Sequence, residues 1–167
     1  MEINSFKQFI KLEIWTKQVL DSWNYQIKAS NKLINVLRDE QLVKEIATGK
    51  NRGTYLLAHM VADHDGMVPL LGLGEKSYPE LETVYIRNPD KSGLQETDTQ
   101  QLREYWNVVN EKLNQHFANF SNEDWFQRHT AATEEAFTIE PHRNKLNILI
   151  SRTVHLAYHL GQMALLK

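Results

Sequence analysis

The chain contains no cysteine among its 167 residues. This absence excludes disulfides, thiolate metal ligands, a cysteine nucleophile and a redox role for the chain itself. Any bound metal must therefore be held by nitrogen and oxygen atoms. If thiol chemistry takes place on this protein, the thiol must arrive as a separate molecule.

The sequence also lacks an excess of charge and a long apolar run. The formal net charge is -2 and the basic residues form no patch, so there is no electrostatic reason to expect nucleic acid. No apolar run reaches the ~18 residues that cross a bilayer, and residues 1–15 alternate apolar with charged side chains instead of forming a signal-peptide core. We therefore expect a cytoplasmic protein that binds neither nucleic acid nor a membrane.

What the sequence does contain is apolar side chains at helical spacing in four long segments. They predict helices over residues 4–37, 54–71, 98–117 and 144–166. The chain length suits a single domain over 1–167, which would bury roughly 70 % of its unfolded surface. Because internal repeats are absent and β-branched alternations are few, we expect an all-α fold, a four-helix bundle.

Two of the connections between these helices are long. Residues 72–96 and 127–143 both exceed the ~2 to 8 residues of simple bundle connections, and we expect crossovers or lids over a site. Shorter helical turns are predicted over 39–46 and after Ser121. The segment 127–143 shows no sustained helical period, and a short hairpin is expected there around 137–139.

Histidines in two of the predicted helices can meet. His155 and His159 are four residues apart, which on a helix means an advance of about 6 Å and a rotation of only about 40°. Two imidazoles on one face can converge on one ion, and His59 could supply a third nitrogen from another helix. The last helix is apolar around most of its circumference, so we expect it to be buried on most sides.

The paired histidines also allow a simpler interpretation. Burying an unpartnered imidazole costs about 1 to 3 kcal/mol, so His155 and His159 require hydrogen bonds, water or a metal. They could bond to each other, to Gln162 and to water in the core. The metal hypothesis gains from His59, whose face also carries Asp63 one turn further on. His64 would face elsewhere, because five residues rotate about 140°.

Two familiar metal motifs are missing from the helices. The residues between the paired histidines are Leu156, Ala157 and Tyr158, so the glutamate of a metalloprotease HExxH is absent. No Glu-x-x-His pair occurs on the predicted helices, as di-iron carboxylate bundles require. Both observations disfavour these two metal chemistries.

Two segments resemble one protein family. The sequence TVHLAYHLGQM, residues 153–163, resembles the closing HxxxHxGQ signature of the DinB superfamily, and GTYLLAHMVADHD, residues 53–65, looks like its second-helix segment with a single ligand histidine. The resemblance implies a DinB-like four-helix bundle that binds a divalent metal through His59, His155 and His159. It also implies that Gln162 is a candidate to contact a ligand histidine without binding the metal itself.

The resemblance further implies a range of activities. Some relatives are thiol S-transferases, in which a low-molecular-weight thiol such as bacillithiol or mycothiol attacks an electrophile. Other relatives have no known reaction, and many are dimeric, so a homodimer is expected here. A site of nitrogen and oxygen ligands favours zinc or nickel, and manganese and iron are also compatible with it.

Several polar residues near the histidines have open roles. Asp63 is a candidate fourth ligand, an acceptor that orients His59, or a solvated helix residue. Tyr158 could donate to a developing anion, although a tyrosine packed at a helix interface is more common. His129 and His142 lie in the irregular segment before the last helix and could approach the mouth of the site.

Three functions fit these features. The first is a metal-dependent thiol S-transferase that acts on a small electrophile. The second keeps the metal but hydrolyses a small ester, amide or lactone. The third is a non-catalytic helical binding or dimerisation protein with a structural metal site. Thiol dependence of turnover separates the first two, and a complete lack of turnover indicates the third.

Overall fold

The computed structural model describes residues 2–167, with side chains from Leu12 onward, and is mostly helical. Its elements are α1 (Glu2–Val36), α2 (Asp39–Leu42), α3 (Gly53–Leu70), α4 (Leu81–Tyr85), α5 (Thr99–Ala118), α6 (Asn122–Trp125), α7 (Glu134–Ile139), α8 (Lys145–Met163) and the 3-10 helix η1 (Ala164–Leu166). Only isolated bridges, and no β-strand, occur within the described residues. The predicted all-α class is confirmed.

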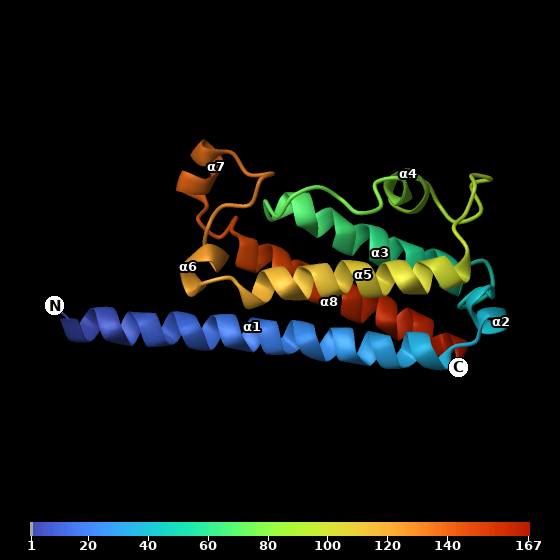
Figure 1. The fold of residues 1–167 in the computed structure, drawn as a ribbon, viewed down its shortest axis with the longest axis horizontal. Helices are drawn as coiled ribbons and strands as arrows, with labels where there is room; N and C mark the ends of the chain where they lie inside the picture. Colours follow the sequence, from blue (N-terminus) through green and yellow to red (C-terminus); the bar gives the residue numbers. More distant parts are fainter. Residues whose placement is uncertain (1) are drawn as a thin grey trace.

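Four long helices lie side by side (Figure 1). Helix α1 packs on α8, α3 packs on α5, and α3 also contacts α8. Helices α1 and α8 run in one direction, whereas α3 and α5 run in the other (Figure 1). Since α3 and α5 are parallel, the chain between them must return along the molecule. This connection is a crossover and carries α4, whereas the connection with α6 and α7 stays at one end.

Side-chain caps set the starts of the later helices. The Asp98 carboxylate accepts hydrogen bonds from backbone N–H groups at the start of α5. Ser121 does the same for α6, and Asn144 does so for α8. These oxygens satisfy N–H groups that have no partner within the helix. The predicted starts of these three elements are therefore confirmed.

The expected hairpin around residues 137–139 is wrong, because this segment forms the end of α7. The Thr133 hydroxyl caps α7 by accepting from the Ala136 N–H. Glu134 and Glu135 occupy its first turn, where negative charge is favoured by the helix dipole. A capping residue followed by acidic residues marks the start of a helix. This signal predicts the structure of the segment better than the short apolar stretch that suggested a hairpin.

The core lies between the four long helices and is built of large apolar side chains. Trp23, Trp106 and Trp125 are buried in it, whereas Trp15 is largely exposed. The buried leucines and methionines of α3 and α8 complete it: Leu56, Leu57, Met60, Met67, Leu149, Leu156 and Met163. This core holds α3 and α8 at a fixed separation.

Helix α8 is less buried than the sequence predicts. Val154 and Tyr158 are 65 % and 62 % exposed, and Leu165 in the following η1 is 66 % exposed. Its neighbours α1 and α3 cover only its inner side, so the outer side faces away from the core. The expectation that α8 is buried on most sides is therefore wrong, and an apolar strip runs along its outer face.

The crossover is fastened to both ends of α3. At the start of α3, the Arg52 guanidinium and backbone N–H both bond to the Asp90 carboxylate. Toward its end, the buried Asp65 carboxylate accepts from the backbone N–H groups of Ser77 and Tyr78, at 2.9 and 2.8 Å. These bonds hold α4 against α3, beside His59.

No helix within the described residues combines the length and the apolar character that a bilayer span requires.

Candidate metal centre

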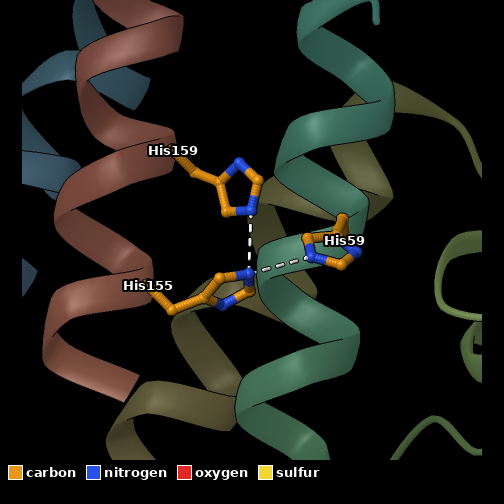
Figure 2. A group of neighbouring side chains, drawn as sticks. All are labelled: His59, His155 and His159. Carbon is orange, nitrogen blue, oxygen red and sulfur yellow. Dashed lines mark hydrogen bonds between the residues drawn. The ribbon is translucent and has the colours of Figure 1, made fainter. Parts of the chain in front are cut away.

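Three histidines from two helices converge between α3 and α8 (Figure 2). His59 projects from α3, and His155 and His159 project from successive turns of α8. The Nε2 atom of His155 lies 3.3 Å from Nε2 of His59 and 2.9 Å from Nε2 of His159. One ligand atom from each of the three residues lies within 4.8 Å of the other two. His155 and His159 thus share one face of α8, as their spacing predicts, and the imidazole of His59 lies against them.

The opposite nitrogens of two rings face groups that can only accept a hydrogen bond. His59 Nδ1 lies 2.7 Å from the backbone carbonyl oxygen of Tyr85. His155 Nδ1 lies 2.9 Å from a carboxylate oxygen of Asp63. A carbonyl and an ionised carboxylate cannot donate, so Nδ1 carries the hydrogen in both rings. In the neutral form of each ring, Nε2 is then left with a lone pair.

His159 follows the same pattern. Its Nδ1 lies 2.8 Å from Oε1 of Gln162, one turn further along α8. His159 is only 8 % exposed, and burial lowers its pKa to about 4 in spite of the opposing hydrogen bond that its ring donates to Gln162. The ring is therefore neutral at pH 7, and its Nε2 also offers a lone pair.

Three nitrogen lone pairs thus face one another with no proton between them in the neutral state. With the Gln162 amide oxygen facing His159, a purely hydrogen-bonded histidine cluster requires at least one of the three rings to be an imidazolium. A cation at the centre satisfies all three nitrogens at once. Two ligands of a tetrahedral ion at ~2.0 to 2.1 Å lie roughly 3.3 Å apart, which is close to the 3.3 Å between His59 and His155 and to the 2.9 Å between His155 and His159.

Asp63 supports a different histidine from the one expected. Its carboxylate bonds to His155 and, through Oδ1, to a guanidinium nitrogen of Arg152 at 3.0 Å, and not to His59. Burial is the largest influence on its pKa and would raise it, but the bond from His155 and the charge of Arg152 together lower the pKa. Asp63 is therefore ionised and fixes the ring orientation of His155.

Tyr158 lies beside the triad but not in it. Its ring centroid is 5.1 Å from that of His159, in an edge-to-face arrangement, and the side chain is mainly exposed on the outer face of α8. The helix rotation places it away from the shared histidine face. Neither the donor role nor the packed-interface role considered for Tyr158 is supported by this position.

His64 occupies a separate environment on the other side of α3. It is 1 % exposed and lies between the rings of Trp23 and Trp106, with centroid distances of 4.9 and 5.0 Å. Its Nδ1 lies 2.8 Å from Oδ1 of Asn110 on α5. His59 thus lies against the α8 histidines, whereas His64 is a residue of the core.

His129 and His142 do not approach the triad. The segment that contains them is tied to the far end of α3, where the backbone N–H of Thr130 donates to the Leu70 carbonyl. Leu70 is eleven residues from His59, roughly 16 Å along the helix axis. The expectation that these two histidines approach the site is therefore wrong.

Two contributors to the centre were not predicted from the sequence. Tyr85 supplies a backbone carbonyl, which any residue type could supply, so no sequence signal marks it. Arg152 holds Asp63 in place from α8. Its position three residues before His155 places the two on one helix face, and this spacing was the available signal.

Comparison with known proteins adds no family assignment. No protein-family model matches the chain, and a search of curated proteins finds no significant match.

Proposed function

We propose that this protein is a DinB-like metalloprotein in which Nε2 of His59, His155 and His159 holds a divalent ion. The observation that carries the proposal is the set of three Nε2 atoms whose partner nitrogens are engaged by Tyr85, Asp63 and Gln162. Zinc and nickel are the preferred ions, and manganese and iron are compatible alternatives, because all three ligands are imidazole nitrogens.

Imidazole binds a metal in its neutral form. The negative charge that orients one of these ligands is the carboxylate of Asp63, which bonds to Nδ1 of His155. Asp63 accepts the hydrogen of His155, which raises the basicity of that ring toward an ion. His155 is also partly exposed, so small molecules can reach this side of the triad. When bound, a divalent ion with an open position supplies a Lewis acid that favours deprotonation of a thiol or of water.

The reaction we propose is thiol S-transfer to a small electrophile. The sulfur of an incoming thiol, having lost its proton, forms a bond to carbon of the electrophile, and the leaving group departs with its electron pair. The absence of cysteine supports an external thiol, since the chain itself has none to offer. The likeness of residues 153–163 to the DinB signature supports the same choice.

Two other functions compete with this proposal. A hydrolase would use water in place of the thiol, and a binding or dimerisation protein would keep the metal without turnover. The separating experiment is turnover of 1-chloro-2,4-dinitrobenzene and a small ester by zinc- or nickel-loaded protein, with and without a low-molecular-weight thiol. Thiol-dependent turnover of the electrophile supports the transferase. Ester hydrolysis that needs no thiol supports the hydrolase, and inactivity toward both supports the non-catalytic protein.

The substitution His155→Ala is the control for this assay. It removes a ligand from the centre while leaving the outer face of α8 unchanged. We expect the variant to lose both its metal and any thiol-dependent turnover. Turnover that persists in metal-free His155→Ala protein would contradict a metal-dependent reaction.

We also propose that the protein acts in the cytoplasm as a homodimer. The exposed parts of Trp15 and of the apolar strip on α8 and η1 (Ile150, Val154 and Tyr158 of α8, and Leu165 of η1) amount to on the order of 500 Å². Trp15, Ile150 and Val154 also line one shared groove. With a polar rim, a second copy of the chain would bury the ~800 Å² per partner of a stable interface.

Light scattering on size-separated protein tests the dimer. We expect Val154→Lys to convert a dimer into a monomer, because it places a charge in the strip. Val108→Lys on α5 is the matched control, since Val108 is also exposed but lies on another helix. An unsubstituted protein that is monomeric at micromolar concentration would contradict the proposal.

A further inference from the structure

A small cavity adjoins the histidine triad. It measures about 200 Å³ and is lined by residues of α3, the crossover and α8: Ala62, Asp63, Gly66, Lys76, Glu82, Ile86 and Arg152. Three of these residues neighbour contacts of the triad. Asp63 binds His155, Ile86 follows the residue whose carbonyl accepts from His59, and Arg152 lies one turn before His155 on α8.

The size of the cavity suits one chemical group and not a whole ligand. Pockets for drug-sized ligands measure ~300 to 1,000 Å³, and one water occupies about 30 Å³ of liquid. At Gly66 an added Cβ would meet no atom within 4 Å, so the α3 wall of the cavity is open there. The cavity therefore fits the end of a molecule whose other end lies at the triad.

The charges around the cavity favour an anion. Lys76 pairs with Glu82, which also binds Arg87, and Arg152 pairs with Asp63. Two cations and two carboxylates line the cavity, and Arg87, which is mainly exposed and lies outside the lining, gives Glu82 a second cation; the positive excess therefore comes from Arg87 and from the metal. Lys76 and Arg152 are themselves largely shielded from solvent, so water screens their charges less than it does at the surface.

Two side chains that line the cavity have donor hydrogens without a partner, although Nε of Arg152 is itself buried and must turn toward the cavity to reach a ligand. Nε of Arg152 is buried and has no hydrogen-bond partner among the described residues. The ammonium of Lys76 has three hydrogens and bonds to Glu82 with one of them. A carboxylate brings one negative charge and two acceptor oxygens, which matches one free donor on each side chain.

We propose that this cavity binds a carboxylate of the thiol whose sulfur reacts at the triad. This inference rests on the proposed metal-dependent thiol chemistry and specifies its cosubstrate as a carboxylated thiol. Asp63 and Gly66 lie four and seven residues beyond His59 on α3, about 6 and 10 Å along the helix. The sulfur and the carboxylate are therefore separated by a chain of several bonds.

The test compares two thiols that differ only in charge. Cobalt(II)-loaded protein is titrated with 5-mercaptopentanoate and with 5-mercaptopentanamide, and binding is followed by the thiolate-to-cobalt absorption. We expect the carboxylate to bind at least about tenfold more tightly than its neutral amide, which corresponds to about 1.4 kcal/mol. Equal affinities in cobalt-loaded protein would overturn this inference and leave the metal proposal standing.

Two substitutions locate the preference in the cavity. Gly66→Leu fills it, and Gly161→Leu is the matched control, because an added Cβ at Gly161 also meets no atom within 4 Å but lies outside the cavity. The preference for the carboxylate should vanish in Gly66→Leu and persist in Gly161→Leu. If Gly66→Leu retains cobalt and still prefers the carboxylate, the inference is wrong.

A second pair of variants decides the outcome if Gly66→Leu does not fold. Lys76→Met removes one cation while Arg87 still pairs with Glu82, and Lys17→Met removes a lysine from an exposed ion pair on α1. We expect only Lys76→Met to lower the carboxylate preference, by several-fold. An unchanged preference in Lys76→Met overturns the inference, and failure of the unsubstituted protein to bind cobalt overturns both this inference and the proposed function.

Discussion

His59 and His64 are five residues apart on one helix and lie in opposite environments. His59 faces α8, where its Nε2 meets that of His155, whereas His64 is enclosed by Trp23 and Trp106. Five residues rotate about 140° around a helix, so α3 presents one histidine to each side. The two are distinguished by what their nitrogens meet and not by burial alone.

The protonation of the two sites sharpens this contrast. His64 Nδ1 donates to Asn110, and its ring faces are covered by tryptophans. Burial lowers its pKa to about 4, against the opposing charge of Asp63 and the bond to Asn110. A neutral ring satisfied in this way is a core residue. At the triad, in contrast, the Nε2 atoms of three rings face one another, and their Nδ1 atoms are engaged by other groups.

The largest expected difference is in metal binding. Replacing His59 by alanine removes one of three ligands, and we expect the affinity for zinc to fall by more than about 100-fold. His64→Gln should bind one ion per chain with unchanged affinity, although it should unfold at a lower temperature. Calorimetric titration with zinc measures the affinity of both variants. Loss of zinc from His64→Gln but not from His59→Ala would reverse the assignment.

Acid should affect the protein through His64. Its folded pKa is about 4 and its unfolded pKa is about 6.5, so the unfolded chain binds more protons between these values. The contribution of His64 to stability is thus fully present above pH 6.5 and is lost as the pH falls toward 4, by on the order of 3 kcal/mol. Urea unfolding of metal-free protein across this range measures the loss.

The control for the acid experiment is His64→Gln, which cannot titrate. We expect its stability to be lower at pH 7 and to fall less steeply below pH 6.5. A variant whose stability falls as steeply as that of the unsubstituted protein would show that His64 does not cause the acid sensitivity.

A smaller effect is expected from the carboxylate behind His155. Asp63→Asn keeps the size of the side chain but removes its negative charge, so His155 becomes a weaker ligand. The expected loss of zinc affinity is about 10- to 100-fold. Asp21→Asn, in an exposed pair with Lys17, provides the matched control. Equal zinc affinities for the two variants would show that Asp63 does not strengthen His155 as a metal ligand.

The smallest effect should follow removal of the amide behind His159. Gln162→Leu deletes a neutral acceptor, which polarises the imidazole less than a carboxylate does. The loss of zinc affinity should therefore stay below about 10-fold, the lower bound for such supporting partners. A larger loss than that of Asp63→Asn, measured in the same titration, would contradict this ranking.

The sequence predicted the long helices well because periodic apolar residues and capping side chains are local signals. Asp98, Ser121 and Asn144 begin their helices as expected. The hairpin expected around 137–139 failed because three residues carry too little periodicity to distinguish a strand from a helix. The exposed outer face of α8 was missed for another reason: an apolar pattern does not say how many neighbours a helix has.

The same distinction between local signals and helix packing explains how much of the site could be predicted from the sequence. Helical rotation distinguished His59 from His64 and placed Asp63 near the histidines, because all of this is local geometry on single helices. The partner of Asp63 depends on how α3 and α8 pack, and the role of Tyr85 depends on where the crossover lies. Neither relation is encoded in the spacing of residues along one helix.

Anomalous scattering from crystals of protein purified without a histidine tag and incubated with zinc tests the central claim most directly. We expect one ion per chain, bound at ~2.0 to 2.1 Å by Nε2 of His59, His155 and His159. Protein that shows no anomalous peak among these three nitrogens after incubation with zinc, nickel or manganese would contradict the account.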